Sequence, residues 1–324
     1  MLLGPKEAHG DGRFVLADAD FTSAYLETAK KGLLKAKVEA ALSLLGPPCR
    51  LCPCRCQGSD RAAGKFGACG IGRKAAVSSH GPHRGEEAVL SGAKGSGTIF
   101  FTGCSLRCAF CQNADISRSG RGDALDPAEL AGVMVRLQKM GCHNVNLVSP
   151  SHVAGQIVEA LPLAVEAGLN IPLVYNTGGY DSLETLAALD GLIDVYMPDF
   201  KFWDERACGR WLGAPDYPSV ARRAIVEMRR QVGDLKVGPD GMARRGVLAR
   251  HLVMPGMTED GARVVGWLAG LSRDMYVNVM GQYRPAGSVG GDGRCEQFDR
   301  RVRREETDAV KAAAVRAGLW RFAD

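Results

Sequence analysis

Eleven cysteines in a chain of 324 residues, most of them in two short stretches, constrain this protein more than any other feature of its sequence. In chain order the three sets are Cys49, Cys52, Cys54, Cys56 and Cys69; Cys104, Cys108 and Cys111; and the scattered Cys142, Cys208 and Cys295. Short spacings are typical of metal sites, whereas isolated cysteines usually behave as small buried hydrophobic residues. The sequence therefore predicts two metal-binding groups of cysteines.

The remaining composition is that of a globular protein, with 46% hydrophobic and 24% charged residues, which excludes bulk disorder. The net charge of +5 is too small to indicate a nucleic-acid partner. No apolar run reaches the roughly 18 residues of a membrane span, and residues 1–12 lack the order of a secretory signal. We expect a cytoplasmic protein without nucleic-acid or membrane partners, in a compartment that disfavours disulfides.

From Gly97 onward, short β-rich runs alternate with helical patterns. The strands are expected at 98–102, 144–149, 173–177, 193–199, 248–254 and 275–280, and the helices at 126–140, 153–168, from 181, 218–232, 259–271 and 306–318. Such alternation predicts a parallel sheet with right-handed crossovers. Six units are fewer than the eight, in about 250 residues, of a closed barrel. The predicted fold class is therefore α/β, a partial (β/α)6 TIM-like barrel, with a flat doubly wound sheet as the alternative.

The position of polar residues favours the barrel. They follow the carboxyl ends of four successive strands: Cys104; Ser149 and Ser151; Asn176 and Thr177; Asp199 and Lys201. Barrel enzymes keep their chemistry at that rim, so the pattern predicts one central site. The alternative is that these residues only mark where strands meet solvent.

Four parts are expected along the chain. Residues 1–48 form an N-terminal helical segment, in which 20–45 reads as one helix; 49–96 form a Cys-rich metal-binding segment; 97–290 form the partial barrel; and 291–324 add a C-terminal helix. The Cys-rich segment has little hydrophobic periodicity, so we expect it to need a metal to fold.

The second cysteine group, Cys104-x3-Cys108-x2-Cys111, directly follows a predicted strand. Three thiolates at this spacing can ligate three irons of a [4Fe–4S] cluster and leave the fourth iron without a protein ligand. A closed zinc site would need a fourth cysteine or histidine nearby, and the loop has none. The alternatives are plain buried cysteines, or a zinc site that borrows a distant ligand.

The segment GCSLRCAFCQN resembles the cluster loop of radical S-adenosylmethionine (SAM) enzymes. Further segments resemble the branch similar to pyruvate formate-lyase-activating enzyme that carries an N-terminal Cys-rich segment; they are NVNLVSPSH, IPLVYNTGGYDSLETLAALDGLIDVYMPDFKF, RHLVMPG and YVNVMGQYRP. The resemblance implies that SAM binds the open iron of the cluster and is reductively cleaved. The resulting 5′-deoxyadenosyl radical would then take a hydrogen atom from the substrate.

The resemblance also implies a set of SAM contacts: Phe110, Ser149, Ser151, Asn176, Thr177, Asp199, Lys201 and His251. Phe110 would lie by the adenine, and Lys201 would reach the SAM carboxylate, with Asp199 helping to bind a monovalent cation. Many relatives have Gly-Gly-Glu where this chain has Ser149-Pro150-Ser151-His152, so Ser149, Ser151 or His152 would replace that contact. A solvated surface charge at Lys201 and a core histidine at His251 are the alternatives.

The first cysteine group has the spacing Cys49-x2-Cys52-x3-Cys56-x12-Cys69, with Cys54 as a fifth cysteine where relatives would carry arginine. Four thiolates suit structural zinc or a fully ligated [4Fe–4S] cluster, and soft-ligand chemistry does not separate the two. We favour zinc, and cysteines without metal are the remaining alternative.

By this resemblance we expect an oxidoreductase that activates a glycyl radical enzyme, with that protein as substrate and a one-electron donor such as flavodoxin or ferredoxin. A radical SAM enzyme that modifies a small molecule or another protein is the first alternative. A non-catalytic metal-binding scaffold is the second.

Overall fold

A computed structural model describes residues 12–119, 121–291 and 295–323. Six parallel strands form the body of the sheet: β2 (Ser96–Phe101), β4 (Val145–Val148), β5 (Leu173–Thr177), β6 (Val195–Pro198), β8 (Ala243–Leu252) and β9 (Tyr276–Met280). They are the six strands that the sequence predicts. Three further strands extend the edges of the sheet: β1 (Ala75–His83), β3 (Asp123–Leu125) and β10 (Arg321–Phe322). Within the described chain the sheet order runs β10-β9-β8-β6-β5-β4-β2-β1-β3, and the sheet does not close. The α/β fold with a partial barrel is therefore confirmed.

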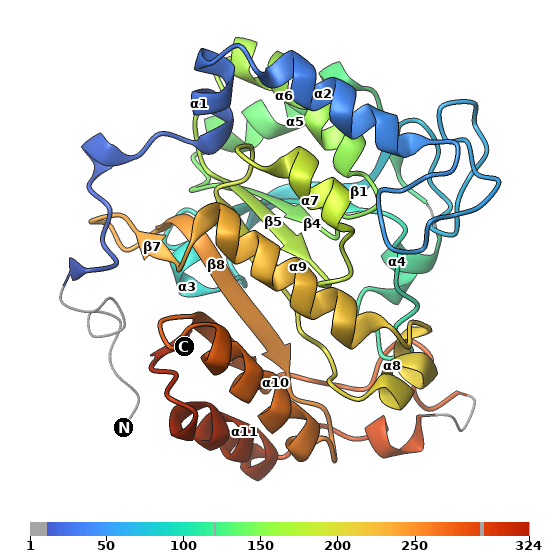
Figure 1. The fold of residues 1–324 in the computed structure, drawn as a ribbon, viewed down its shortest axis with the longest axis vertical. Helices are drawn as coiled ribbons and strands as arrows, with labels where there is room; N and C mark the ends of the chain where they lie inside the picture. Colours follow the sequence, from blue (N-terminus) through green and yellow to red (C-terminus); the bar gives the residue numbers. More distant parts are fainter. Residues whose placement is uncertain (1–11, 120, 292–294, 324) are drawn as a thin grey trace.

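Helices follow the parallel strands along their outer side (Figure 1). They are α5 (Pro127–Lys139), α6 (Ala154–Glu166), α7 (Leu183–Leu189), α8 (Glu205–Leu212), α9 (Tyr217–Val232), α10 (Thr258–Leu271) and α11 (Arg304–Arg316). Asp126 begins α5 with a capping box: its side chain accepts from the Glu129 amide, and the Glu129 carboxylate accepts from the Asp126 amide. The helix expected from 181 begins one residue later than that position would give, because Ser182 caps α7 while the Asp181 carboxylate accepts from Tyr175 and Thr177.

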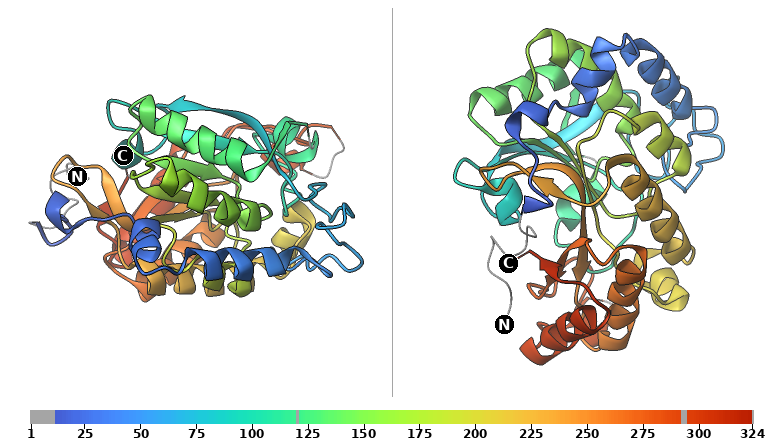
Figure 2. Two further views of the ribbon diagram at one scale, coloured as in Figure 1. Left: turned by 90° about the horizontal axis from the view of Figure 1, so that it is seen from above. Right: turned by 60° about the vertical axis from the view of Figure 1, so that its left-hand side comes forward.

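The N-terminal segment corrects one expectation. Residues 20–45 do not form a single helix but two, α1 (Ala24–Lys30) and α2 (Leu34–Leu42), followed by a short 3-10 turn. The break lies at Gly32, whose φ of 71° is left-handed and ends the first helix. Figure 2 shows both helices, in blue, along one side of the molecule, where α2 packs against α6.

Asp194 connects these helices to the barrel. Its fully buried carboxylate accepts the amide of Ala24 at 2.8 Å and that of Leu173 at 2.9 Å, so one side chain joins the start of α1 to the start of β5. The Tyr25 hydroxyl adds a bond to the Ile171 carbonyl at 2.9 Å.

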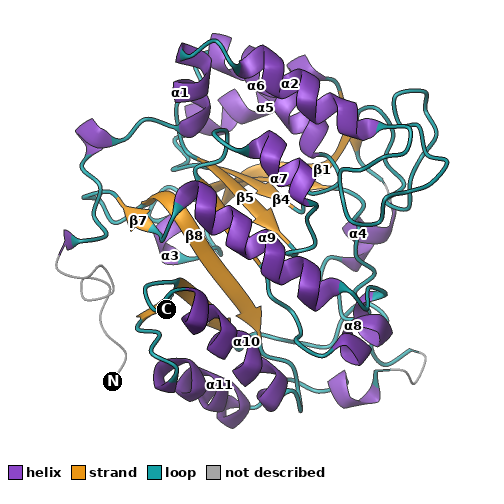
Figure 3. Ribbon diagram, viewed as in Figure 1, coloured by secondary structure: helices purple, strands orange, loops and turns teal. Residues whose placement is uncertain are grey.

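The segment 49–96 is not uniform. Residues 49–74, which we call the Cys-rich loops, consist of turns and loops, as Figure 3 shows. From Ala75 the chain instead adds β1 (Ala75–His83), antiparallel to β2, and the short helix α3 (Ala88–Ser91), two elements that the sequence analysis did not predict within the Cys-rich segment. Three small strands also lie outside the prediction: β3 (Asp123–Leu125), β7 (Lys236–Val237) and β10 (Arg321–Phe322). α4 (Ala114–Ser119) follows the second cysteine group.

None of the helices in the described part of the chain combines the length and apolar character that a membrane crossing requires.

Candidate functional site

A cavity of about 420 Å³ lies at the carboxyl ends of the parallel strands. Most of the predicted site residues line it: Cys104, Cys108, Phe110, Cys111, Ser149, Ser151, Asn176, Thr177, Asp199 and Lys201. They come from β2, β4, β5 and β6 and the loops that follow these strands. The rim residues therefore converge on one central site and do not merely mark separate strand ends.

The loop with Cys104, Cys108 and Cys111 is held by backbone hydrogen bonds to the end of α8. The amide of Arg107 donates to the Leu212 carbonyl at 3.0 Å, and that of Ala109 donates to the Trp211 carbonyl at 2.8 Å. Backbone anchoring leaves the three thiols half-buried and facing the cavity.

Burial raises the pKa of the Cys104 thiol, and it raises the pKa of Cys108 to about 12 although the Lys201 ammonium opposes it. Such thiols are protonated on their own and become ligands only when a metal displaces the proton. Three soft sulfur donors on one cavity wall suit an iron–sulfur cluster with three protein ligands.

Gly103 makes this loop possible where it leaves β2. Its φ is 77°, and a Cβ at this position would lie 2.5 Å from the Cys69 carbonyl oxygen. The close approach also shows that the Cys-rich loops pack directly against the cavity loop.

Asp199 is the centre of a charged network inside the barrel. Its two carboxylate oxygens accept from Lys201 Nζ at 2.7 Å and from Arg250 Nε at 2.9 Å. Arg250 also donates to Asn176 Oδ1 at 2.7 Å. Burial raises the pKa of Asp199, but the charges of Arg250 and Lys201 outweigh burial, so the net pKa lies below its usual value.

This network bears on two expectations. The monovalent cation that the resemblance implied at Asp199 stays a prediction, and in this structure the Arg250 guanidinium bridges Asp199 and Asn176. Lys201 is not a solvated surface charge, since only 18% of its side chain is exposed.

His251 does not join the cavity and is corrected to a core histidine. Its Nδ1 lies 2.8 Å from the Phe200 carbonyl, its ring packs by Gly261 of α10, and 3% of it is exposed. The reason is the two-residue period of β8: Arg250 points into the barrel, so His251 points out. Strand alternation in the sequence would have located Arg250, which begins the segment RHLVMPG but to which the resemblance assigns no role.

The Ser149–His152 turn follows β4 and borders the cavity. Ser149 has a φ of 57°, in the left-handed region that favours glycine, and its amide donates to the Asn176 carbonyl. The Ser151 hydroxyl lies 3.0 Å from that of Thr177. His152 Nε2 bonds to the Thr102 carbonyl at 2.7 Å, and burial lowers its pKa to about 4, so it is a neutral structural side chain although it borders the cavity.

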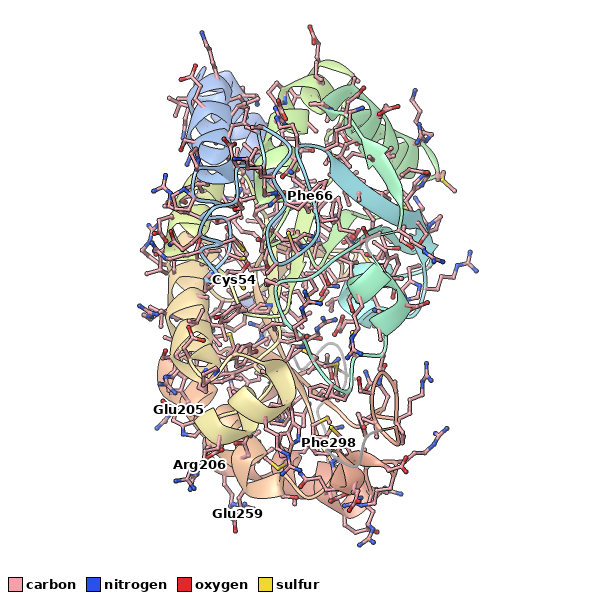
Figure 4. The ribbon with its side chains drawn as sticks, turned by 90° about the vertical axis from the view of Figure 1, so that its right-hand side faces the viewer. Cys54, Phe66, Glu205, Arg206, Glu259 and Phe298 are labelled. Carbon is pink, nitrogen blue, oxygen red and sulfur yellow. The ribbon has the colours of Figure 1, made fainter. Side chains whose placement is uncertain are left out.

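The Cys-rich loops keep Cys49 and Cys52 buried, Cys56 and Cys69 half-buried, and Cys54 exposed (Figure 4). A hydrogen bond with Cys54 raises the pKa of the Cys52 thiol. In the described part of the chain, no three His, Cys, Asp or Glu side chains converge tightly enough to hold one metal ion. Zinc at these cysteines stays a prediction.

Arg61 stands in the sequence as one of several basic neighbours of these cysteines, and the structure shows that it also joins the Cys-rich loops to the barrel. Its side chain is 1% exposed, and it donates to the His152 carbonyl at 2.5 Å and to the Gly72 carbonyl at 3.1 Å. Nη1 also lies 3.8 Å from Cys49 Sγ. One buried guanidinium therefore joins the first cysteine group to the turn that borders the cavity.

The profile of the Radical SAM superfamily matches residues 98–267, more than half of the chain. The chain belongs to the radical SAM superfamily. Membership implies an enzyme that uses a [4Fe–4S] cluster and SAM, and the three thiols in the cavity provide suitable ligands for such a cluster. A relative is the uncharacterized protein MJ0674 of Methanocaldococcus jannaschii, which is 30% identical over 271 residues, or 80% of this chain and 72% of the relative.

Solved radical SAM enzymes are also similar. The methyltransferase TsrM of Kitasatospora setae aligns with a TM-score of 0.40 and 15% identity over 54% of this chain and 34% of its own. The cobalamin-dependent enzyme OxsB, with aqua-cobalamin bound, aligns with a TM-score of 0.34 and 11% identity over 50% of this chain and 24% of its own. The chain thus spans 34% and 24% of the lengths of these two structures.

Proposed function

We propose that Cys104, Cys108 and Cys111 hold the [4Fe–4S] cluster of this radical SAM enzyme and that SAM binds in the same cavity. The observation that carries the proposal is the convergence of these thiols with a lysine and an asparagine from other strands on one cavity. When bound, the cluster supplies the electron that cleaves SAM to methionine and a 5′-deoxyadenosyl radical, which abstracts hydrogen from the substrate.

Lys201 is the proposed partner of the SAM carboxylate. Burial disfavours its charge, but Asp199 outweighs burial and keeps the pKa of Lys201 above its usual value, so the ammonium stays charged. An ammonium has three donors, and the bond to Asp199 uses one of them. The other donors are available for a carboxylate, which makes a strong charge-assisted bond.

Phe110 is the proposed apolar contact of the adenine. Its ring packs edge-on against Phe202, with centroids 5.6 Å apart, and against Phe298, with centroids 6.0 Å apart. Such a cluster fixes the ring and keeps water from this side of the cavity. A dry wall protects a reactive radical from side reactions.

The test is oxygen-free reconstitution, followed by iron counting and a SAM-cleavage assay on the wild type, Cys108→Ala and Cys142→Ala. Cys142 is a buried cysteine outside both groups, so it is the matched control. We expect cleavage to 5′-deoxyadenosine in the wild type and the control and none in Cys108→Ala. Cleavage that survives Cys108→Ala would contradict the ligand assignment.

The finer proposal is that the enzyme activates a glycyl radical enzyme by abstracting hydrogen from a glycine of that partner, with a flavodoxin or ferredoxin as electron donor. It is supported by the sequence segments that resemble the pyruvate formate-lyase-activating branch. A glycyl radical signal by electron paramagnetic resonance on a co-expressed partner would support it. Deoxyadenosine formation with no such signal on any candidate partner would favour a small-molecule or other protein substrate.

A second metal site on Cys49, Cys52, Cys56 and Cys69, filled by zinc, is part of the same proposal. It is supported by the four thiols in loops that have little regular structure of their own. Zinc there would hold the loops against the cavity wall.

A further inference from the structure

The amino end of the barrel is closed by the short helix α3. Its Val89 and Leu90 are buried in one cluster with Val174, Val195, Met197, Leu248 and Tyr276, from four of the parallel strands. The Asn144 side chain fixes the helix by donating to the Leu90 carbonyl at 2.8 Å. In Figure 1, α3 lies near the start of β8, opposite the end where the Cys-rich loops lie. The residues just before α3 therefore form the floor of the barrel.

Two consecutive glutamates, Glu86 and Glu87, occupy this floor. Glu86 lines the same cavity as the cysteine loop, and 11% of its side chain is exposed. Glu87 is more deeply buried, with 4% of its side chain exposed. Its Oε1 accepts from Asn278 at 2.9 Å, while its Oε2 is buried without a hydrogen-bond partner.

Arg250 lies between this floor and the rim. Its Nη1 is 3.7 Å from Glu86 and 3.9 Å from Glu87, while its other nitrogens are committed to Asp199 and Asn176. The guanidinium is thus too far from either glutamate for a direct hydrogen bond. When both are ionised, these carboxylates keep acceptor capacity that no other described side chain fills; when Glu86 is protonated, its carboxyl group can hydrogen-bond to Glu87.

The charges of this interior do not balance. Glu86, Glu87 and Asp199 bring three negative charges against two positive charges on Arg250 and Lys201, an excess of one negative charge when all are ionised. Burial, only partly offset by Arg250, raises the pKa of Glu86 to about 7, and neighbouring Glu87 adds to the rise. In the free protein a proton bound near neutral pH can make up the missing positive charge.

We propose that this floor recognises the substrate by a positively charged amine or guanidine, with Glu86 as its direct partner and Glu87 behind it. A cation of this kind would replace the proton, complete the charge balance and donate to the free acceptor positions. A neutral group would leave the excess charge in place. The inference deepens the proposed function, since it takes the cavity to be the one in which that substrate reacts.

The test measures binding to the reconstituted protein by calorimetry, under oxygen-free conditions at pH 7.5, with probes of matched shape. The probes are n-butylamine, the uncharged 1-butanol, and a capped Gly-Lys-Gly peptide, which carries the same ammonium on a protein-like chain. We expect at least one of the two ammonium probes to bind tenfold or more tightly than 1-butanol. Preference for the free amine indicates a small-molecule substrate, and preference for the peptide indicates a lysine of a protein.

Variants locate the binding. Glu86→Gln should lose the tenfold preference, whereas Glu86→Asp, which keeps the charge, should retain part of it. Glu259→Gln is the matched control, because Glu259 is exposed on α10, away from the cavity (Figure 4), and should bind as the wild type does.

Equal binding of the charged and neutral probes, or a preference that persists in Glu86→Gln, would overturn the inference. Failure of the proposed function is separate, because it would appear as absent SAM cleavage in the wild type, whereas the probe experiment requires no turnover.

Discussion

Arg250→Ala should be the most damaging single substitution inside the barrel that touches no cysteine. The side chain is 15% exposed and makes hydrogen bonds of 2.9 Å to Asp199 and 2.7 Å to Asn176. Its removal leaves Lys201 alone to balance Asp199, Glu86 and Glu87. Breaking a buried ion pair from one side typically costs about 3–5 kcal/mol, because an uncompensated charge stays behind. For a chain of this size, we expect the melting temperature to fall by roughly 4–7 °C.

The loss should depend on pH in a defined direction. The pKa of Glu86 in the folded protein, about 7, lies above its ordinary value of 4.5, so the folded state binds the extra proton between these values. The stability that this proton brings is fully present below pH 4.5 and is lost as the pH rises through 7. Arg250 lowers this pKa and that of Asp199, so its removal raises both and strengthens the gain in stability on acidification. The difference between wild type and variant should therefore shrink between pH 8 and pH 5.

The assay is a melting curve of the oxygen-free reconstituted protein at pH 8, 7, 6 and 5. Arg223→Ala is the control, because Arg223 is exposed on α9 and its loss should change stability by no more than about 0.5 kcal/mol. A potassium series should raise the stability of Arg250→Ala above that in choline chloride, because K⁺ can enter between Asp199 and Asn176. An Arg250→Ala protein that melts like the control at pH 8, or that loses more stability on acidification, would refute this reasoning.

Three further substitutions test separate features. Asp194→Asn should lower the free energy of unfolding in urea by about 1–3 kcal/mol. Both carboxylate oxygens of Asp194 accept backbone amides, and the asparagine side chain would turn its NH2 group toward one of these amides. Unchanged stability would mean that these two bonds contribute little. Gly103→Ala should lower the iron content of the reconstituted protein, because φ is 77° and the new Cβ meets the Cys69 carbonyl, whereas full iron loading would show that the loop shifts freely. Cys52→Ala should reduce solubility and remove zinc but retain the SAM-binding iron, and loss of a second iron site instead of zinc would reverse our choice of metal.

The sequence predicted those parts of the site that depend on neighbours along the chain. The three cysteines lie within a stretch of eight residues just after β2, so spacing alone brings them together. The predicted strand ends placed four more residues at the cavity, because the carboxyl ends of parallel strands meet at one rim. These residues are Asn176, Thr177, Asp199 and Lys201. The runs of β-branched residues likewise located the six parallel strands.

The floor was not predictable by the same means. α3 has four residues, too few to show helical periodicity, and it lies in a Gly-rich stretch that is typical of loops. β1 contains Ser, Gly, Pro and two His in its second half, so it lacks the alternation of a half-buried strand. Glu86 thus lies in a segment whose structure the sequence pattern does not show. The fold nevertheless brings its carboxylate to 3.7 Å from Nη1 of Arg250, a residue of β8 more than 160 residues later in the chain.

Asp199 shows that a short sequence motif does not specify all the partners of its residues. The Asp-x-Lys spacing resembles that of activating enzymes, and Lys201 does lie at the cavity as that spacing implies. The second oxygen of Asp199 is nevertheless taken by Arg250, a residue that the motif does not include. The Arg250 guanidinium is part of the chain and cannot diffuse away, so it should neutralise Asp199 even without added salt. A bound cation would neutralise Asp199 only when that cation is present in solution. Arg250 also lies near Glu86 and Glu87. A charge that enters the floor should therefore act on Arg250, and through the bond from Arg250 to Asp199 it should also act on Lys201.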